Sequence, residues 1–298
     1  MTVVTARAIT AALGLAAIVV GTSACSSTAR SDSHTNPPAR STTTSGPSRA
    51  ALTDPFGWLM TRQVIAEVWS DSAARRRLSA SPIDELLQPG QQPLVGVPAR
   101  TVESFASAAE LQSAVREHAL PAHTYAVLYD PEGWAFTPIS EQRNPVAAAV
   151  TAAATAHAHG LQFFVAPGLN LSTVLSPSGR GTREAQFLSL RLVGQMARSA
   201  DAVELQAQSL ERNRRAYRSF VTAAAAQARA ANPEVHLIAG LSTNPPGAVV
   251  TVSELRDDIR ATRSTVNGYW LNVPGAGARC PTCNASRPDI AIELTLQP

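Results

Sequence analysis

The pattern of apolar and polar positions after residue 50 predicts strands that alternate with helices. Short runs rich in β-branched and aromatic residues are typical of buried strands, and an apolar stripe every three to four residues is typical of a helix. The predicted strands are 124–130, 161–167, 200–206, 235–241, 268–273 and 290–296, with a further one inside 94–105. The predicted helices are 55–79, 107–118, 145–160, 182–198, 211–231 and 253–265, and 81–93 is predicted to be a loop.

Repetition of strand, helix and strand predicts the fold class. A crossover helix returns the chain to the same edge of the sheet, so the strands it joins run parallel. The sequence therefore predicts an α/β fold, a TIM-like (β/α) barrel that is regular, irregular or short of eight strands, preceded by an N-terminal helix. An open doubly wound sheet is the alternative, but no Gly-rich nucleotide loop follows any predicted strand.

Two acidic residues lie at the end of the strand predicted over 124–130. Ala126, Leu128 and Asp130 share one face because side chains alternate along a strand, and Glu132 follows just past the end. Barrel enzymes place their chemistry at the carboxyl ends of the strands. Asp130 and Glu132 are therefore candidate catalytic residues, although Asp before Pro also commonly caps a turn.

The strand predicted over 200–206 carries a third carboxylate. Val203 and Leu205 form one face of this strand, and Glu204 and Gln206 form the other. Helices cover the outside of a barrel, so the apolar face should pack outward and Glu204 should point inward. Burial raises the pKa of a carboxyl group, as a general acid at neutral pH requires. Glu204 is the candidate catalytic acid/base, and Gln206 is a candidate substrate ligand. An antiparallel or edge strand with an ordinary solvated face is the alternative.

Amide and aromatic residues near the other strand ends complete the candidate site. Amides bind sugar hydroxyls and aromatic faces stack on sugar rings, so a site of this kind suits a carbohydrate. A tryptophan in a strand is also typical of a core, and an asparagine after a strand is typical of a turn. The candidate substrate-binding residues are Asn244, Asn272, Trp134 and Trp270.

The first 24 residues have the pattern of a secretion signal. An arginine precedes an apolar run over 9–20 that is too short to span a bilayer, and small residues lead to Cys25. This resembles the lipobox of bacterial lipoproteins, with Thr22 where the usual pattern has Leu. The resemblance implies that Cys25 is lipidated and anchors the protein to the outer face of the cell membrane. Ordinary cleavage near Ala24 is the alternative.

The next segment is predicted to be a disordered tether. Residues 26–50 contain 12 Ser or Thr and three Pro, with no aromatic or large aliphatic residue. Such a stretch buries too little apolar area to offset the entropy lost on ordering. The predicted organisation is a signal peptide over 1–24, a lipidated Cys with its tether over 25–51, and a single barrel-like domain over 52–298.

The remaining cysteines fit an exported protein. Cys280 and Cys283 form a CxxC pair in a loop rich in Gly, Pro and Asn. A structural zinc site needs about four ligands, and no second pair is nearby. Outside the cytosol, a disulfide between Cys280 and Cys283 is the expected state. No metal and no cofactor is predicted.

Composition excludes several classes of function. The chain is 45% hydrophobic and 16% charged, which is too apolar for a disordered chain and too mixed for a multi-span membrane protein. A net charge of +3 gives no support for a nucleic-acid partner. All 25 basic residues are Arg, which excludes Schiff-base lysine chemistry, a P-loop lysine and a Ser-Lys dyad.

The segment from Asp130 to Asn272 resembles extracellular barrel glycosidases, which place an acid at the end of a central strand and often a second carboxylate on a neighbour. The resemblance implies a cell-surface glycoside hydrolase acting on an extracellular or envelope glycan. The acidic repeat of chitinase-like barrels (DxxDxDxE) is absent before Glu204. A non-catalytic ligand-binding or envelope-scaffold lipoprotein is the alternative, and a barrel that has lost its activity is a third reading.

Overall fold

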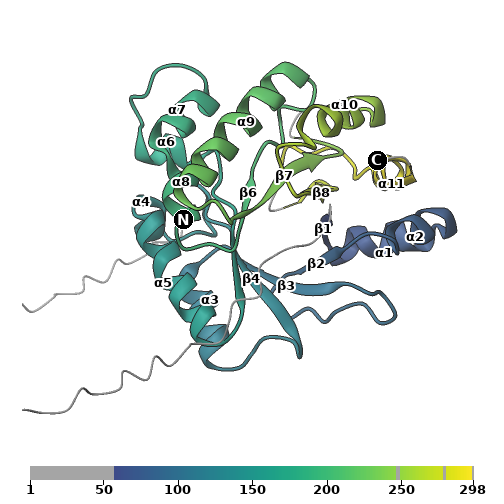
Figure 1. Cartoon of the computed structure of the whole chain (residues 1–298), viewed down its shortest axis with the longest axis horizontal. Helices are drawn as coiled ribbons and strands as arrows, with labels where there is room; N and C mark the ends of the chain where they lie inside the picture. The colour runs from purple at the N-terminus through teal and green to yellow at the C-terminus, as the bar shows by residue number, and fades with distance from the viewer. Residues whose placement is uncertain (1–56, 246–248, 278–279, 297–298) are drawn as a thin grey trace, which may run out of the picture. The chain divides into compact units, whose positions relative to one another are not determined.

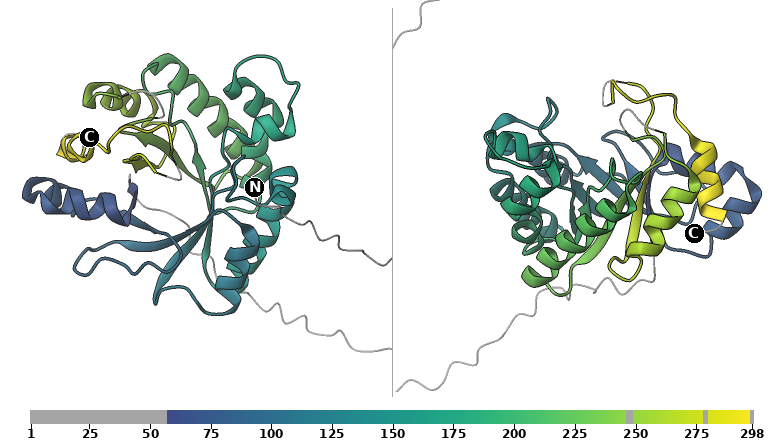
Figure 2. Two further views of the ribbon diagram at one scale, coloured as in Figure 1. Left: turned by 180° about the vertical axis from the view of Figure 1, so that it is seen from behind. Right: turned by 90° about the horizontal axis from the view of Figure 1, so that it is seen from above.

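The computed structural model describes residues 57–245, 249–277 and 280–296. Within these residues eight parallel strands, β1 to β8, pair in sequence order and close into a barrel, because β8 also pairs with β1. Helices surround the barrel on its outside (Figures 1 and 2). The fold is a (β/α)8 TIM barrel, which confirms the predicted fold class. The predicted signal peptide, Cys25 and the tether lie outside the described residues.

The strands alternate with helices along the chain. The strands are β1 (Gly57–Thr61), β2 (Ile83–Leu87), β3 (Arg100–Phe105), β4 (Thr124–Tyr129), β5 (Gln162–Val165), β6 (Ala202–Leu205), β7 (His236–Ser242) and β8 (Gly268–Asn272). The helices are α1 (Arg62–Ser70), α2 (Ser72–Leu78), α3 (Ala108–Arg116), α4 (Ile139–Arg143), α5 (Pro145–Ala158), α6 (Leu171–Leu175), α7 (Arg183–Leu190), α8 (Leu192–Ala197), α9 (Arg214–Ala231), α10 (Val252–Thr262) and α11 (Pro288–Leu296). None of the helices in the described part of the chain is long and apolar enough to cross a membrane.

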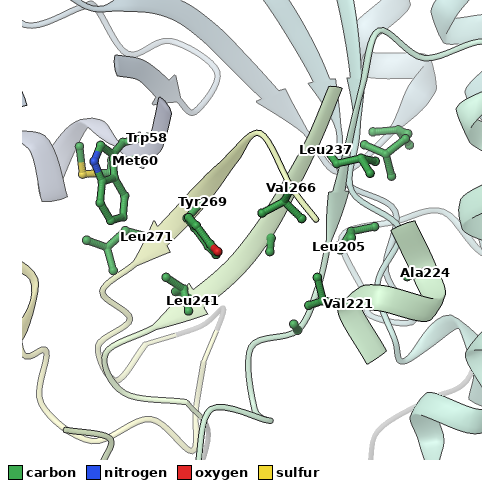
Figure 3. Close-up of a cluster of buried hydrophobic side chains, with 14 of the residues drawn as sticks. Trp58, Met60, Leu205, Val221, Ala224, Leu237, Leu241, Val266, Tyr269 and Leu271 are labelled. Atoms are coloured by element: carbon green, nitrogen blue, oxygen red, sulfur yellow. The ribbon is translucent and has the colours of Figure 1, made fainter. Parts of the chain in front are cut away.

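Alternation along the strands divides the core into two layers. The inner layer fills the barrel and includes Leu128 of β4, Phe164 of β5 and Ala202 of β6. The outer layer lies between the strands and the helices; Figure 3 shows part of it, with Leu205 of β6 and Val221 of α9 among its members. This alternation identifies the inward-facing positions of each strand. We call the carboxyl end of the barrel the mouth, and the polar inward-facing residues at the strand ends line it.

The first strand was not expected from the sequence, and the predicted N-terminal helix over 55–79 is wrong in its first part. β1 runs directly into α1, and Thr61 caps that helix by accepting a hydrogen bond from the backbone N–H of Val64 at 3.4 Å. No turn residues separate the two elements, so one apolar run covers both. α1 and α2 then account for the remainder of the predicted helix.

The second strand lies in the segment 81–93, which was predicted to be a loop because it is rich in Pro and Gln. Asp84 points into the barrel end and pairs with Arg100 at 2.7 Å, and Glu85 accepts the backbone N–H of Leu94 at 3.1 Å. Both carboxyl groups are buried. Their partners lie on or near the next strand, so tertiary contacts make this charged strand possible.

The last predicted strand, 290–296, is wrong: it is helix α11. Ile290, Ala291, Leu294 and Thr295 are buried, which is the spacing of a helix that packs on one face. Helix α11 packs against α1, α2 and α10 and so covers the side of the barrel where β1 pairs with β8. Pro288 and Asp289 in its first turn are helix-start signals.

Candidate functional site

Three carboxylates approach one another at the mouth. Tyr129, Val165 and Val203 pair across β4, β5 and β6, so the next residues, Asp130 and Glu204, flank the small side chain of Ala166. Ala202 belongs to the inner core and Leu205 to the outer core, which places Glu204 inside the barrel as predicted. Residues that are 74 positions apart in sequence (204 − 130) thus face each other across one intervening strand.

Glu204 is the most deeply buried acid of the group. Its side chain is 1% exposed, and its Oε2 has no hydrogen-bond partner among the described residues. Burial raises the pKa of Glu204 well above its ordinary value, and the charges of Asp130 and Glu132 raise it further. Burial and the two neighbouring carboxyl groups therefore both favour the neutral, proton-carrying form of Glu204.

Asp130 is oriented by the amide of Gln206. Nε2 of Gln206 donates to Oδ1 of Asp130 at 2.9 Å and to the carbonyl of Ala166 at 3.0 Å. Gln206 thus points into the mouth, as predicted, but its amide N–H groups donate to groups of the protein and not to open space. In the absence of substrate its role is to position Asp130, which is 7% exposed.

Glu132 is held by the loop that follows β5. Nδ2 of Asn170 donates to Oε2 of Glu132 at 2.9 Å, and Oδ1 of Asn170 accepts the backbone N–H of Gly133 at 2.7 Å. A Cβ on Gly168 would lie 2.6 Å from Cγ of Glu132, so only glycine at this position leaves room for the Glu132 side chain. The two loops therefore fix Glu132 jointly.

Aromatic side chains stand on the same loop as Glu132. Trp134 and Phe136 meet edge to face with ring centroids 5.0 Å apart, and Nε1 of Trp134 donates to Oγ1 of Thr137 at 3.0 Å. Phe136 is 45% exposed, and the nearby Ile139 is also exposed. This loop offers apolar surface beside the carboxylates, which is the type of surface that contacts a sugar ring.

Two of the residues predicted to bind substrate, Trp270 and Asn244, are buried. Trp270 is part of the inner core and is 8% exposed, so its ring packs on side chains of the barrel instead of lining an open surface. Asn244 is fully buried, and its Nδ2 donates to the carbonyl of Ala285 at 3.0 Å, so it anchors the loop after β8. Asn272 ends β8 on the inward face and is partly exposed.

The loop after β8 carries the predicted disulfide. Cys280 and Cys283 are joined by a disulfide bond. The backbone N–H of Cys280 donates to the carbonyl of Gly277 at 3.0 Å, which tightens the same turn. Together with the Asn244–Ala285 contact, the disulfide holds a loop at the mouth side of the barrel.

Three residues that support this cluster were not predicted from the sequence: Gln208, whose amide lies 3.4 Å from Glu204, Gly240, which adjoins Gln208, and Glu211, which holds the loop that carries Gln208. Gln208 continues the alternating polar positions of β6 but lies past its end, and Gly240 is an inward position of β7 without a side chain. Glu211 is 1% exposed and accepts backbone N–H groups from Ser209 and Ser242. Burial raises the pKa of Glu211 to about 7. The alternating polar residues that begin at Glu204 could have indicated Gln208. No sequence pattern indicated Glu211 or Gly240.

The described residues hold no group of three or more His, Cys, Asp or Glu side chains that could bind a metal ion. The chemistry that the mouth offers is that of a neutral carboxylic acid, Glu204, beside the oriented carboxyl groups of Asp130 and Glu132. The fold and this site define the class: a (β/α)8 barrel with a cluster of carboxyl groups at the carboxyl ends of its strands.

No protein-family model matches the sequence, and no curated protein matches it. Solved structures match the fold. A Bacteroides thetaiotaomicron protein assigned as an α-L-fucosidase has 7% identity and a TM-score of 0.49, with 84% of this chain and 95% of that chain covered. A Chromobacterium violaceum chitinase has 12% identity and a TM-score of 0.47, covering 82% and 99%. A Bartonella henselae triosephosphate isomerase has 12% identity and a TM-score of 0.42, covering 74% and 92%. At such identities and scores, these likenesses say nothing about the function of this chain.

Proposed function

We propose that this protein is a cell-surface lipoprotein hydrolase that acts on an extracellular or envelope glycan through carboxylate acid–base chemistry. The observation that carries the proposal is the burial of Glu204 beside Asp130 and Glu132 at the carboxyl ends of the barrel strands. The lipid anchor is assigned to Cys25 from the sequence. No cofactor is required by this chemistry.

Glu204 is the proposed general acid. Its raised pKa keeps a proton available near neutral pH, and the departing glycosidic oxygen receives that proton as the bond to the anomeric carbon breaks. Glu204 is then a carboxylate, which can take the proton back from the water that completes hydrolysis.

Asp130 or Glu132 supplies the second carboxylate. One of them stabilises the positive charge that develops on the sugar, either as a nucleophile or by activating water on the opposite face of the ring. Gln206 and Asn170 orient these groups through the hydrogen bonds described above. The anomer released first, read by NMR, distinguishes the two routes, because a nucleophile retains configuration and activated water inverts it.

Asn272 and the aromatic loop would contact the sugar. Asn272 is the inward amide that is partly exposed, and Trp134 with Phe136 presents apolar surface beside Glu132. We assign the stacking contact to Trp134, because Trp270 is buried in the inner core.

The test is the substitution Glu204→Gln, assayed by release of reducing ends from a panel of purified envelope glycans and aryl glycosides. Gln mimics the neutral carboxyl group in shape but has no transferable proton, so turnover should fall by about 10²–10⁴-fold while the thermal melting point is kept.

Glu103→Gln is the matched control. Glu103 is a buried acid on β3 that is 2% exposed, but its position alternates with inward-facing Val102, so it lies on the outer side of the barrel. This variant should keep its activity. Full turnover by the Glu204 variant would contradict the assignment, and binding of a glycan without turnover by the wild type would favour the non-catalytic receptor.

A further inference from the structure

The amide of Gln208 occupies the space that a side chain at position 240 would fill. A Cβ built on Gly240 would lie 2.3 Å from Cδ, 2.4 Å from Nε2 and 2.4 Å from Oε1 of Gln208, and these are its three nearest atoms. Gly240 faces into the barrel, because Leu241 and Ala239 on either side of it belong to the outer core. Gln208 therefore folds back from the loop after β6 and lies against bare backbone of β7.

The same amide contacts the carboxyl group of Glu204. Nε2 of Gln208 donates to Oε1 of Glu204 at 3.4 Å, whereas Oε2 has no hydrogen-bond partner among the described residues. The two oxygens of this buried carboxyl group are thus in different surroundings, with a donor at one of them only.

The backbone next to Gln208 is fixed by Glu211. Ser209 has a φ of 104°, a strained value for a residue with a side chain. Its N–H donates to Oε2 of Glu211 at 2.6 Å, while Oε1 of Glu211 accepts the N–H of Ser242 at 2.8 Å. Glu211 therefore ties the loop that carries Gln208 to the end of β7, two residues beyond Gly240.

Gly240 is also fixed from the outer side of the barrel. The hydroxyl of Tyr217, which is fully buried on α9, donates to the carbonyl of Gly240 at 2.9 Å. With the strand held by Tyr217 and the ladder of β7, an added methyl group at position 240 must displace the Gln208 amide, the end of a flexible side chain, and not the backbone.

We propose that Gln208 is a positioning residue that fixes the transferable proton of Glu204 on Oε2, and that Gly240 is the residue that makes this placement possible. The inference rests on the proposed role of Glu204 as general acid and adds the atom that delivers the proton.

The physical reason is the hydrogen-bonding capacity of a neutral carboxyl group. It has one carbonyl oxygen that accepts and one hydroxyl oxygen that donates. An N–H aimed at Oε1 favours the carbonyl form there, so the O–H bond forms at Oε2. During reaction the O–H bond at Oε2 breaks, the proton goes to the departing glycosidic oxygen, and the same N–H then stabilises the carboxylate.

Infrared spectroscopy tests this placement without any substrate. The difference spectrum between the wild type and Glu204→Gln isolates the C=O band of neutral Glu204, and its loss as the pH rises gives the pKa. Gln208→Leu removes the donor, so the band should move to higher wavenumber and the pKa should rise by about one unit. Gly240→Ala should give the same two changes because it displaces the donor.

The double variant Gln208→Leu/Gly240→Ala makes the test specific. If Gly240 acts only through Gln208, the second substitution adds nothing to the first, and the double variant matches Gln208→Leu. Gln227→Leu is the matched control, since it removes a partly buried amide that donates to the carbonyl of Leu188 on the outer side of the barrel. It should leave the Glu204 band unchanged.

An unchanged band in Gln208→Leu would overturn the proposal, and so would additive shifts in the double variant. Should Gly240→Ala fail to fold, the spectrum of Gln208→Leu still decides the role of Gln208. Because these measurements need no turnover, an active Glu204→Gln would refute the proposed function while the infrared result stands or falls independently.

Discussion

Three buried carboxyl groups in this barrel differ in what their oxygens contact. Both oxygens of Glu211 accept backbone N–H groups, one oxygen of Glu204 accepts a side-chain N–H, and neither oxygen of Asp258 has a hydrogen-bond partner among the described residues. Glu211 and Glu204 belong to the mouth and its support, whereas Asp258 lies on α10 in the outer layer. A buried carboxyl group without donors is neutral unless the pH is high.

Asp258→Asn should therefore change the pH dependence of stability. Burial raises the pKa of Asp258 to about 8, and the charges of Glu211, Asp257 and Glu254 add to this effect while Arg214 opposes it. The folded state then binds a proton that the unfolded chain has released, so this group stabilises the fold at low pH, and the stability is lost as the pH rises from about 4 to about 8.

The variant carries no titrating group at this position, so its melting temperature should exceed that of the wild type by a margin that grows over this pH range. Circular dichroism melts at several pH values measure it. Glu234→Gln, which removes an exposed acid that is not among the charges acting on Asp258, is the control and should show no such growth. A constant margin for Asp258→Asn would contradict the neutral state of Asp258.

At the scale of elements, the sequence correctly predicted strands whose tertiary contacts agree with their local pattern of apolar and polar residues. The strands over 124–130, 161–167, 200–206, 235–241 and 268–273 all correspond to strands of the barrel. The short helices α4 and α6 lie in segments predicted to be loops, and β1, β2 and α11 were predicted as the wrong type because local signals conflict with tertiary contacts. No turn separates β1 from its helix, β2 lies in a segment rich in Pro and Gln, and apolar residues alternate in α11 as they would in a strand although it packs as a helix.

Closure of the sheet depends on the pairing of β1 with β8, where Gly57 and Gly268 are partners. A Cβ on Gly268 would lie 2.5 Å from the carbonyl oxygen of Gly57, a backbone atom that cannot move without breaking the pair. Gly268→Ala should therefore lower the free energy of unfolding by about 2 kcal/mol or more, measured by urea denaturation.

Gly277→Ala is the control for this prediction. A Cβ there would have its nearest neighbour at 4.0 Å, so its stability should stay within about 0.5 kcal/mol of the wild type. Equal stability of the two variants would show that β1 and β8 do not approach as closely as the described pairing requires.

At the scale of the whole molecule, we propose separate tasks for the barrel and the N-terminal segment. The barrel brings the carboxylates together, and the segment that ends at Cys25 is proposed to set where they act. A tether of the composition found over 26–50 would let the barrel stand away from the membrane.

Cys25→Ser tests the anchor. Lipidation requires the thiol, so the wild-type chain should partition with membranes and the variant should appear in the soluble exported fraction, with the mass of the mature chain lowered by that of the lipid. Immunoblots of fractionated cells and mass spectrometry measure both. Ser23→Ala retains the thiol and is the control. Soluble export of the wild type would instead support ordinary cleavage near Ala24.

The sequence by itself determined the fold class, the inward direction of Glu204 and the position of Asp130 at a strand end, because alternation along a strand and parallel crossovers are local rules. Only the tertiary structure decided that eight strands close, that Asn244 and Trp270 are buried, and that Gln208 reaches Glu204 past Gly240. Those features depend on which distant segments of the chain pack together. The burial of a residue, its hydrogen-bond partners and the effect of the missing side chain at Gly240 therefore follow only from the tertiary structure.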